Sequence, residues 1–312
     1  MSQQTAFEYL AHGQIPFFRL RSVPLSVGVP DAARAVLLGA PYDGGATYRP
    51  GSRFAPYEVR RVSALVQGYH PVHSVSVFDK LGVVDGGNVV FPPFDAARVR
   101  SRIESAVDTV LAANAVPFVV GGDHSIALPI LRALAKRHGP LAVVHLDAHL
   151  DMSGPEMWSE DFHHGTSFRH ALEEGLIARG QLHQVGVRGP ARSARDRDLA
   201  AEHGAHLISS NQVAECGAAS VAGEICKRVA DRPVYLSFDV DVVDPAYAPG
   251  TGTPVPGGLS SREALQFLQG LAVKLVGMDL VEVCPALDHA DMTSCLAAHI
   301  LFEGLSLAAL AA

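Results

Sequence analysis

The chain has 312 residues, of which 48% are hydrophobic and 18% charged, and its formal net charge is −7. A chain of this length can bury a full core in one large domain, and without a basic excess it lacks the electrostatic footprint of a nucleic-acid binder. The four cysteines form no C-x-x-C pair and are too few for a disulfide framework, which predicts a reducing, cytoplasmic location. The N-terminus lacks a signal-peptide pattern and the apolar tail 305–312 is too short to span a bilayer, so we expect no membrane partner.

Short apolar runs alternate with segments of helical periodicity along the chain. In chain order, the runs predicted as strands are 35–40, 116–120, 141–146, 183–188, 206–209, 234–238 and 275–280. The segments predicted as helices are 97–114, 127–139, 221–231, 261–272 and a C-terminal helix over 294–312. The Gly- and Pro-rich stretches 42–57 and 245–258 each follow a strand and are predicted as loops. This pattern predicts a single α/β domain over residues 1–312, with a central, mainly parallel sheet between two layers of helices.

Three polar motifs directly follow predicted strands. They are GGDHS (121–125), DAHLD (147–151) and DVDVVDP (239–245). Ligands of open α/β sheets bind at the carboxyl edge of the strands, so we expect the three motifs to converge in space. Taken singly, each motif could instead cap a strand end or a turn, and Asp244, just before Pro245, is assigned that structural role.

The side chains of these motifs form a set typical of metal ligands. In extended backbone alternate residues point the same way, and the spacing within the second and third motifs aligns their Asp and His side chains. With the histidine of the first motif, the candidate ligands are His124, Asp147, His149, Asp151, Asp239 and Asp241. The carboxylates would repel one another in a buried place unless cations held them, and two divalent ions would balance their charge. A thiolate-free, oxygen-rich set suits Mn²⁺ or Mg²⁺ better than a structural zinc.

Together the three motifs resemble the signatures of the ureohydrolases, the arginase/agmatinase family, and the resemblance runs from roughly residue 39 to 304. It implies an arginase/deacetylase-like α/β fold, a binuclear Mn²⁺ centre held by the six candidate ligands, and hydrolysis of a guanidinium to urea and an amine. Asp147 would bridge or chelate the ions together with Asp239 or Asp241, and the sequence leaves open which does what. Ni²⁺ or Co²⁺ would also suit these ligands. The resemblance further implies a homo-oligomer, either a trimer or a hexamer.

The same resemblance assigns two catalytic residues outside the ligand set. The segment HHGTSF (163–168) matches a His-Gly segment that carries a proton-shuttling histidine. This places the shuttle at His164, with His163 as its rival and as a substrate-binding neighbour. The segment GMDLVEVCP (277–285) matches the one whose carboxylate grips the guanidinium, which is Glu282. Glu282 would bind the guanidinium bidentately, and His164 would protonate the leaving amine.

Two further residues receive supporting roles. Thr253, in the GTGTP loop, matches a substrate-contacting threonine, although a turn-forming role explains it equally well. Asp123 could act by orienting the neighbouring ring of His124. We therefore expect Thr253 on the wall of the active site and Asp123 behind the ligands.

The segment after the second motif bears on the substrate. Arginases have a loop rich in Asn, Ser and Thr there, whereas this chain has MSGPEMWSEDFHHG (152–165), which disfavours arginine. The stretch YDGGATYRPGSRFAP (42–56) resembles agmatinases and their relatives, the guanidinobutyrases and proclavaminate amidinohydrolase. We therefore expect the substrate to be a small guanidino compound other than arginine, and the group at the far end of this compound, its tail, is still to be assigned.

The acidic and basic residues of the chain favour substrate tails of opposite charge. Glu156, Glu160 and Asp161 could attract an ammonium group, which makes agmatine, cleaved to putrescine, the first expectation. A carboxylate tail would need a cation, for which Arg49 and Arg53 are the candidates. The alternatives are then 4-guanidinobutyrate, 3-guanidinopropionate or a proclavaminate-type substrate.

Two hypotheses from other classes compete with this one. A deacetylase-like amide hydrolase would use a single zinc with about three protein ligands, whereas six candidate ligands favour two ions. A catalytically silent subunit that only binds guanidines would need a broken ligand set, and each expected ligand type is present. The sequence therefore favours an enzyme with two metal ions.

Overall fold

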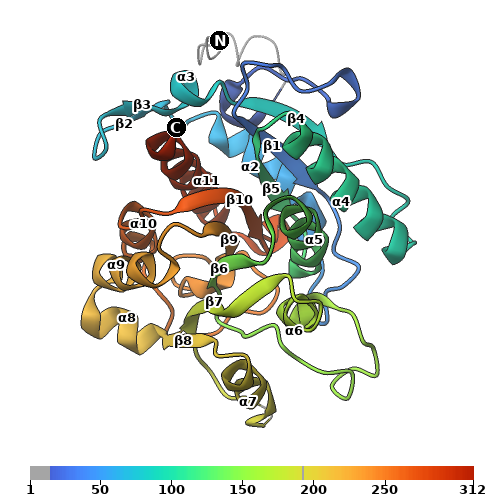
Figure 1. Cartoon of the computed structure of the whole chain (residues 1–312), viewed down its shortest axis with the longest axis vertical. Helices are drawn as coiled ribbons and strands as arrows, with labels where there is room; N and C mark the ends of the chain where they lie inside the picture. Colours follow the sequence, from blue (N-terminus) through green and yellow to red (C-terminus); the bar gives the residue numbers. More distant parts are fainter. Residues whose placement is uncertain (1–14, 192) are drawn as a thin grey trace.

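The computed structural model describes residues 15–191 and 193–312, so residues 1–14, on which the signal-peptide prediction depends, lie outside it. The described chain is built on an eight-stranded sheet in which every pair of neighbouring strands is parallel (Figure 1). In spatial order the strands are β4 (Val84–Asn88), β1 (Ala35–Ala40), β5 (Val116–Gly121), β10 (Lys274–Val281), β9 (Pro233–Asp239), β6 (Leu141–Leu146), β7 (Ile177–Val187) and β8 (His206–Ser209). A separate antiparallel hairpin consists of β2 (Tyr69–His70) and β3 (Val75–Ser76). The predicted parallel α/β sheet is confirmed.

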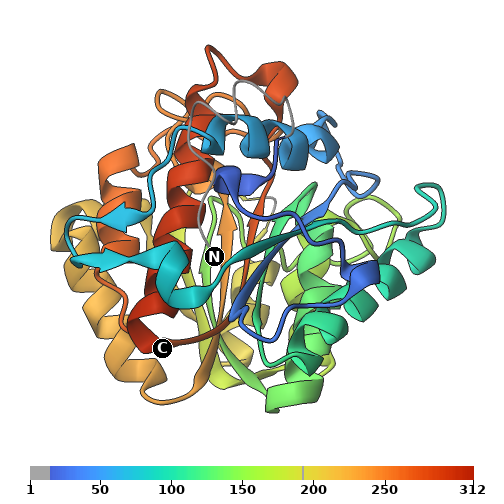
Figure 2. The ribbon, with the colours of Figure 1, turned by 90° about the horizontal axis from the view of Figure 1, so that it is seen from above.

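Helices cover both faces of the sheet and make three layers (Figure 2). The helices on one face are α2 (Ala55–Ser63), α3 (Val77–Leu81), α8 (Ser210–Cys216), α9 (Ala218–Val229), α10 (Ser261–Gln269) and α11 (Met292–Ala311). The helices on the other face are α4 (Ala96–Ala112), α5 (Ala127–His138), α6 (Ser167–Glu173) and α7 (Arg195–Glu202). A strand between two helix layers must be apolar on both sides, and every residue of β1 and β6 is buried.

α11 packs along the sheet as a core helix. It is long and apolar enough to cross a membrane by length and composition, but 78% of its most apolar window is buried inside the protein. A Cβ added at Gly304 would meet the Met278 sulfur at 2.2 Å, so the glycine lets α11 approach β10 closely. The predicted C-terminal helix is confirmed, and it begins two residues earlier than expected.

Several elements differ from the sequence-based expectation. β4 was not predicted because its sequence, VDGGN, contains two glycines and few apolar residues, yet it pairs with β1 at the sheet edge. α2 begins at Ala55, inside the stretch predicted as a loop, with a proline in its first turn, where proline is well tolerated. β7 begins at Ile177 rather than at residue 183. The short helices α3, α6, α7 and α8 were also missed because five to eight residues give little periodicity.

Candidate metal centre and active site

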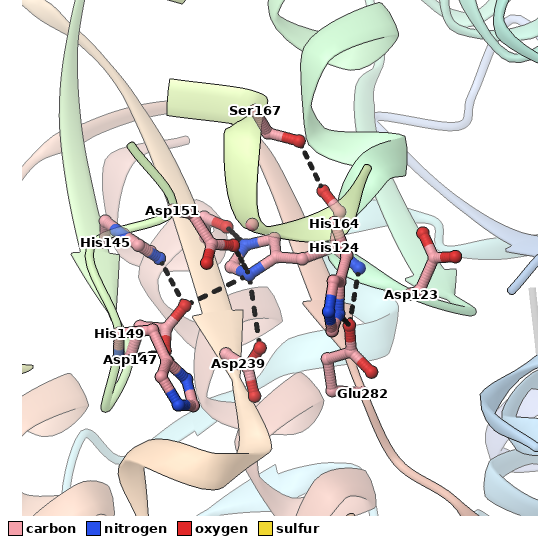
Figure 3. Close-up of polar contacts among 12 residues, drawn as sticks. Asp123, His124, His145, Asp147, His149, Asp151, His164, Ser167, Asp239 and Glu282 are labelled. Carbon is pink, nitrogen blue, oxygen red and sulfur yellow. Dashed lines mark hydrogen bonds and ion pairs between the residues drawn. The ribbon is translucent and has the colours of Figure 1, made fainter. Parts of the chain in front are cut away.

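The candidate ligands meet at the carboxyl edge of the four central strands. β5, β10, β9 and β6 are consecutive neighbours in the sheet. The polar residues at or just after their carboxyl ends are His124, Glu282, Asp239 and Asp147. Parallel strands bring these ends to one edge, and Figure 3 shows the side chains facing one another. The convergence expected from the three motifs is therefore observed.

One half of the cluster surrounds the fully buried ring of His124. Its Nδ1 lies 3.2 Å from Asp147 Oδ2, 3.0 Å from Asp151 Oδ2 and 3.2 Å from Asp239 Oδ2. None of these contacts is a well-aligned hydrogen bond, so within the described residues Nδ1 is a buried polar atom without a hydrogen-bond partner. Such an atom requires an explanation, because buried nitrogens are normally paired.

A hydrogen-bond chain behind His124 fixes which ring nitrogen faces the carboxylates. Ser237 Oγ donates to Asp279 Oδ1 over 2.8 Å, and the Tyr235 hydroxyl donates to the same carboxylate. Because the one hydroxyl proton of Ser237 is used, its oxygen accepts from His124 Nε2 over 2.8 Å. Burial disfavours a charged His124 ring, but the three carboxylates outweigh burial and raise the pKa of His124 well above its usual value. With one proton on Nε2, the ring turns Nδ1 toward three carboxylate oxygens, an arrangement that calls for a second ring proton or a cation at Nδ1.

The other half of the cluster is more open. His149 Nδ1 lies 3.1 Å from Asp241 Oδ2 and 3.3 Å from Asp147 Oδ1, and the His149 side chain is 40% exposed. Asp147 thus faces His124 with one carboxylate oxygen and His149 with the other. Two ligand groups that share one carboxylate are what a pair of neighbouring ions requires.

Burial and mutual repulsion perturb the carboxylates of the cluster. Burial, and then the charges of Asp241 and Asp147, raises the pKa of Asp239 well above its usual value. Burial also raises the pKa of Asp241. Burial opposes the charged form of Asp147 too, but the three histidine rings around its carboxylate outweigh burial and hold its pKa well below the usual range. Two divalent cations would relieve this repulsion, so the residues present fit a binuclear centre.

The extended backbone predicted for the second and third motifs is wrong, although their side chains do converge. Asp151 has a φ of 51°, so the chain turns after Asp147 instead of continuing β6. Asp241 lies in the 3-10 helix η6 (Val240–Val242), and Asp239 caps that helix by accepting the Asp241 amide over 2.9 Å. Tight turns rather than strand alternation bring these side chains to one place.

His145 is a site residue that the sequence analysis missed. Its Nδ1 accepts from Gln184 Nε2 over 2.9 Å, so its Nε2 donates to Asp147 Oδ2 over 2.8 Å. The ring stacks on Phe168 with the centroids 3.9 Å apart, which fixes its orientation. His145 lies two residues before Asp147, and this spacing is the signal that could have identified it.

Glu282 and His164 form a polar pair beside the cluster. His164 Nδ1 lies 2.7 Å from Glu282 Oε1, which also accepts the His124 amide over 2.9 Å. Glu282 is 3% exposed, and its φ of 62° is a left-handed conformation that costs about 1–3 kcal/mol. Burial disfavours a charged His164 ring, but Glu282 outweighs this effect and raises the pKa of His164 to about 9. A protonated imidazole therefore lies beside a buried carboxylate at neutral pH.

Asp123 does not orient His124, contrary to our expectation. Its carboxylate accepts the Gly45 amide over 2.6 Å, and Figure 3 shows it pointing away from the His124 ring. It also caps the 3-10 helix η4 (His124–Ile126), which begins at His124. By binding Gly45 it fixes the loop that carries Thr47, whose hydroxyl lies 2.8 Å from His164 Nε2. Asp123 therefore supports His164, and Ser237 takes the role that we had assigned to it.

The cluster opens into a cavity of about 280 Å³. Thr253 lies on its inner wall and donates to Asp241 Oδ2 over 3.3 Å. His163 also lies there, but its Nδ1 accepts the Gly165 amide over 3.1 Å and so caps the 3-10 helix η5 (His164–Thr166). The outer wall consists of residues 153–158 and the start of α7. Of the two adjacent histidines, it is His164 that contacts Glu282.

The acidic residues predicted to attract an ammonium tail are mostly engaged elsewhere. Asp161 pairs with Arg169 over 2.8 Å and is not part of the cavity wall. Glu160 is not part of the wall either. Glu156 does line the cavity, where it pairs with Arg195 over 2.8 Å.

The two arginines predicted to meet a carboxylate tail are also placed elsewhere. Arg53 pairs with Asp43, and Arg49 donates to backbone carbonyls of a neighbouring loop. The arginines on the cavity wall are instead Arg188 and Arg197. Arg188 donates to several backbone carbonyls, whereas Arg197 is exposed and makes no ion pair with any residue that the structure describes. Arg197 was missed because no sequence pattern connects it to the motifs.

Comparisons with known proteins agree with this site. The family model described as the Arginase family matches residues 33–306. Proclavaminate amidinohydrolase from Streptomyces clavuligerus is 44% identical over 291 residues, which cover 93% of this chain and 91% of that protein. Guanidinobutyrase from Pseudomonas aeruginosa is 39% identical, with 88% and 86% covered. Mitochondrial agmatinase from Gallus gallus is 38% identical, with 87% and 80% covered.

Solved structures share the fold. That of proclavaminate amidinohydrolase from Streptomyces clavuligerus has a TM-score of 0.89 at 44% identity and covers 96% of this chain and 98% of its own. That of Trypanosoma cruzi formiminoglutamase with Mn²⁺ has a TM-score of 0.84 at 26% identity, with 94% and 98% covered. The two His and Asp ligand groups fit the binuclear metal centre of this family. The chain is therefore a hydrolase of guanidino compounds and belongs to the arginase family.

Proposed function

We propose that this protein cleaves the guanidinium group of a small guanidino acid to urea and an amine, using two Mn²⁺ ions. One observation carries the proposal. Two metal-ligand groups that share Asp147 open onto a single cavity, and His164 on the wall of that cavity pairs with a buried carboxylate, Glu282. Two ligand groups support two ions rather than the single zinc of a deacetylase-like enzyme.

The ligands divide between the two ions as the geometry groups them. One ion would be held by His124, Asp147, Asp151 and Asp239, and the other by His149, Asp147 and Asp241. When bound, the ions supply a water that is acidic near neutral pH and positive charge that stabilises the transition state. Imidazole nitrogens and carboxylate oxygens suit Mn²⁺, and Co²⁺ or Ni²⁺ are the alternatives that metal analysis would reveal.

Glu282 and His164 would handle the organic substrate. Glu282 would bind the cationic guanidinium through charge-assisted hydrogen bonds and hold its carbon beside the metal ligands. His164, whose pKa is raised to about 9, turns Nδ1 toward Glu282, and Thr47 contacts Nε2 with its amide, which donates over 3.3 Å, and with its hydroxyl at 2.8 Å. His164 would give a ring proton to the leaving amine. Thr253 would fix Asp241, and His163 would support the segment that carries His164.

Arg197 favours an acidic tail on the substrate. Its guanidinium is the cationic group of the outer wall that is not already paired within the described chain, and Arg presents a fork of donors that suits a carboxylate. The relatives named proclavaminate amidinohydrolase and guanidinobutyrase are the precedents for such substrates.

Agmatine is the second candidate, and one observation favours it. Asp196 lies on the same outer wall and is half-buried, with Ser153 donating to it over 3.3 Å. A carboxylate there could receive an ammonium tail. Burial, however, raises the pKa of Asp196, because a half-buried carboxylate is less well solvated than an exposed one, whereas Arg197 is exposed.

Urea release from 4-guanidinobutyrate, 3-guanidinopropionate, agmatine and arginine tests the proposal. We expect kcat/KM for a guanidino acid to exceed that for agmatine by about tenfold or more, and Arg197→Gln to remove most of this advantage. Arg102→Gln is the matched control because Arg102 is exposed on α4, away from the cavity. A preference for agmatine that survives Arg197→Gln and disappears in Asp196→Asn would establish the second candidate instead.

A further inference from the structure

A second group of metal-ligating side chains lies outside the active site, where the β2–β3 hairpin meets α11 (Figure 1). His70 ends β2, His73 lies in the turn of the hairpin, and Glu303 projects from α11. A ligand atom from each of the three lies within 4.8 Å of the others. These residues belong to none of the motifs that form the catalytic cluster.

The contacts within this group fix its geometry. His70 Nε2 lies 2.9 Å from Glu303 Oε2, and the His70 ring stacks on Phe302 with the planes 7° apart. The His73 ring lies over that of His70, with centroids 4.5 Å apart. Gln269 holds the second oxygen of Glu303 with a 2.7 Å hydrogen bond. Three ligands from two separate elements are therefore held close together before any ion is bound.

Two features of the group are unexplained by hydrogen bonding alone. His73 Nε2 is buried and has no hydrogen-bond partner among the residues that the structure describes. Glu303 is 6% exposed, and its hydrogen-bond partners are an imidazole and an amide rather than a lysine or arginine. A buried carboxylate beside an unpaired imidazole nitrogen is costly unless a cation joins them.

We propose that His70, His73 and Glu303 form a second, non-catalytic metal site that takes Zn²⁺ or a similar nitrogen-preferring divalent ion. Two imidazoles and one carboxylate are a common zinc ligand set, which a water would complete as the fourth ligand. Burial, and then the neighbouring His70, lowers the pKa of His73, so its ring is neutral at neutral pH and can bind the ion. The ion would bind His70 at Nε2, and the proton of that nitrogen would move to Nδ1 of the same ring. Nδ1 would then no longer accept the His73 amide, which lies 3.3 Å away. It would tie the hairpin to α11.

Zinc content of the Mn²⁺-loaded protein after equilibrium dialysis against micromolar Zn²⁺ tests the proposal. The variants are His73→Ala, Glu303→Gln and the control His299→Ala, which removes an exposed histidine from the same helix α11. Any exchange of zinc into the catalytic centre occurs in all four proteins alike. We expect wild type and His299→Ala to hold one more Zn²⁺ per chain than the other two variants. Zinc should also raise the unfolding temperature of wild type and His299→Ala only.

Two outcomes would overturn the site. Equal zinc content in all four proteins would mean that the group is a hydrogen-bonded clamp, since the amide of Glu303→Gln can still accept from His70. Loss of zinc in His73→Ala but not in Glu303→Gln would exclude the carboxylate as a ligand. Urea release should be unchanged in both cluster variants, because neither residue lies on the active-site cavity.

Discussion

The floor and the rim of the cavity are built on opposite principles. The floor comprises the polar residues at the carboxyl ends of β5, β10, β9 and β6, and the rim comprises residues 153–158 with the start of α7. On the floor, His124 is fully buried and fixed by Ser237, and Glu282 is held in a strained conformation. On the rim, Trp158 is 53% exposed and Arg197 is exposed without an ion pair in the described chain.

This contrast assigns catalysis and substrate choice to different parts of the molecule. Electrostatic catalysis needs groups whose positions are fixed before the substrate arrives, which the buried floor provides. Recognition of a substrate tail needs only a few exposed side chains, which can change without disturbing the floor. Substitutions on the floor should therefore abolish turnover or metal binding, and those on the rim should change KM.

The largest effect is expected for Asp239→Asn on the floor. The variant removes a charge that the cations need, so metal content should fall and kcat should drop by roughly 10³-fold or more. The metal-free variant should nevertheless be at least as resistant to heat as metal-free wild type, because one repelling buried charge is gone. Elemental analysis, urea release and thermal unfolding without metal measure the three quantities. Asp244→Asn, on the same loop but bound to backbone amides, should keep its metal.

Glu282→Gln should reduce kcat/KM by roughly 100- to 1,000-fold, because an amide cannot supply the charge that holds a guanidinium. Metal content should stay at the wild-type value, since Glu282 is not in either ligand group. This separates guanidinium binding from metal binding within the floor. Loss of metal in this variant would instead show that the Glu282 contact with the His124 amide is needed to form the centre.

Ser237→Ala should weaken metal binding by about 10- to 100-fold, the usual effect of removing the hydrogen bond that orients a histidine ligand. His124 would lose the acceptor that keeps its proton on Nε2. Titration of metal-free protein with Mn²⁺ measures the change, and excess Mn²⁺ should restore most of the activity. The control is Ser306→Ala, which removes a buried serine of α11 that does not contact His124. An unchanged affinity for Mn²⁺ would mean that burial alone positions the His124 ring.

The sequence predicted the floor because each of its residues directly follows a buried apolar run. Once β6 is placed, Asp147 must lie at its carboxyl edge, whatever the turn after it does. His145 was missed because a histidine inside such a run looks like part of the strand. Asp123 was misassigned because adjacency in sequence says nothing about direction, and its side chain turns toward Gly45.

The rim could not be predicted because distant segments meet there. Trp158 and Arg197 are far apart in sequence, and α7 has too little periodicity to identify as a helix. The expectation about the substrate tail consequently rested on Glu156, which lines the cavity but pairs with Arg195, and on Glu160 and Asp161, which lie off the cavity wall. Cytoplasmic location, a trimeric or hexameric state, and the absence of nucleic-acid and membrane partners stay predictions.

The smallest effect is expected for Trp158→Ala on the rim. Its ring lines the outer wall and is half-exposed, so its loss should remove part of the contact with the substrate tail and raise KM about three- to tenfold. The value of kcat should change less than twofold, and metal content should not change, because Trp158 belongs to neither ligand group. Phe94→Ala is the control, since Phe94 is fully exposed and lies away from the cavity. A large fall in kcat would mean that closing the rim over the substrate helps to assemble the floor, and the two regions would then act as one.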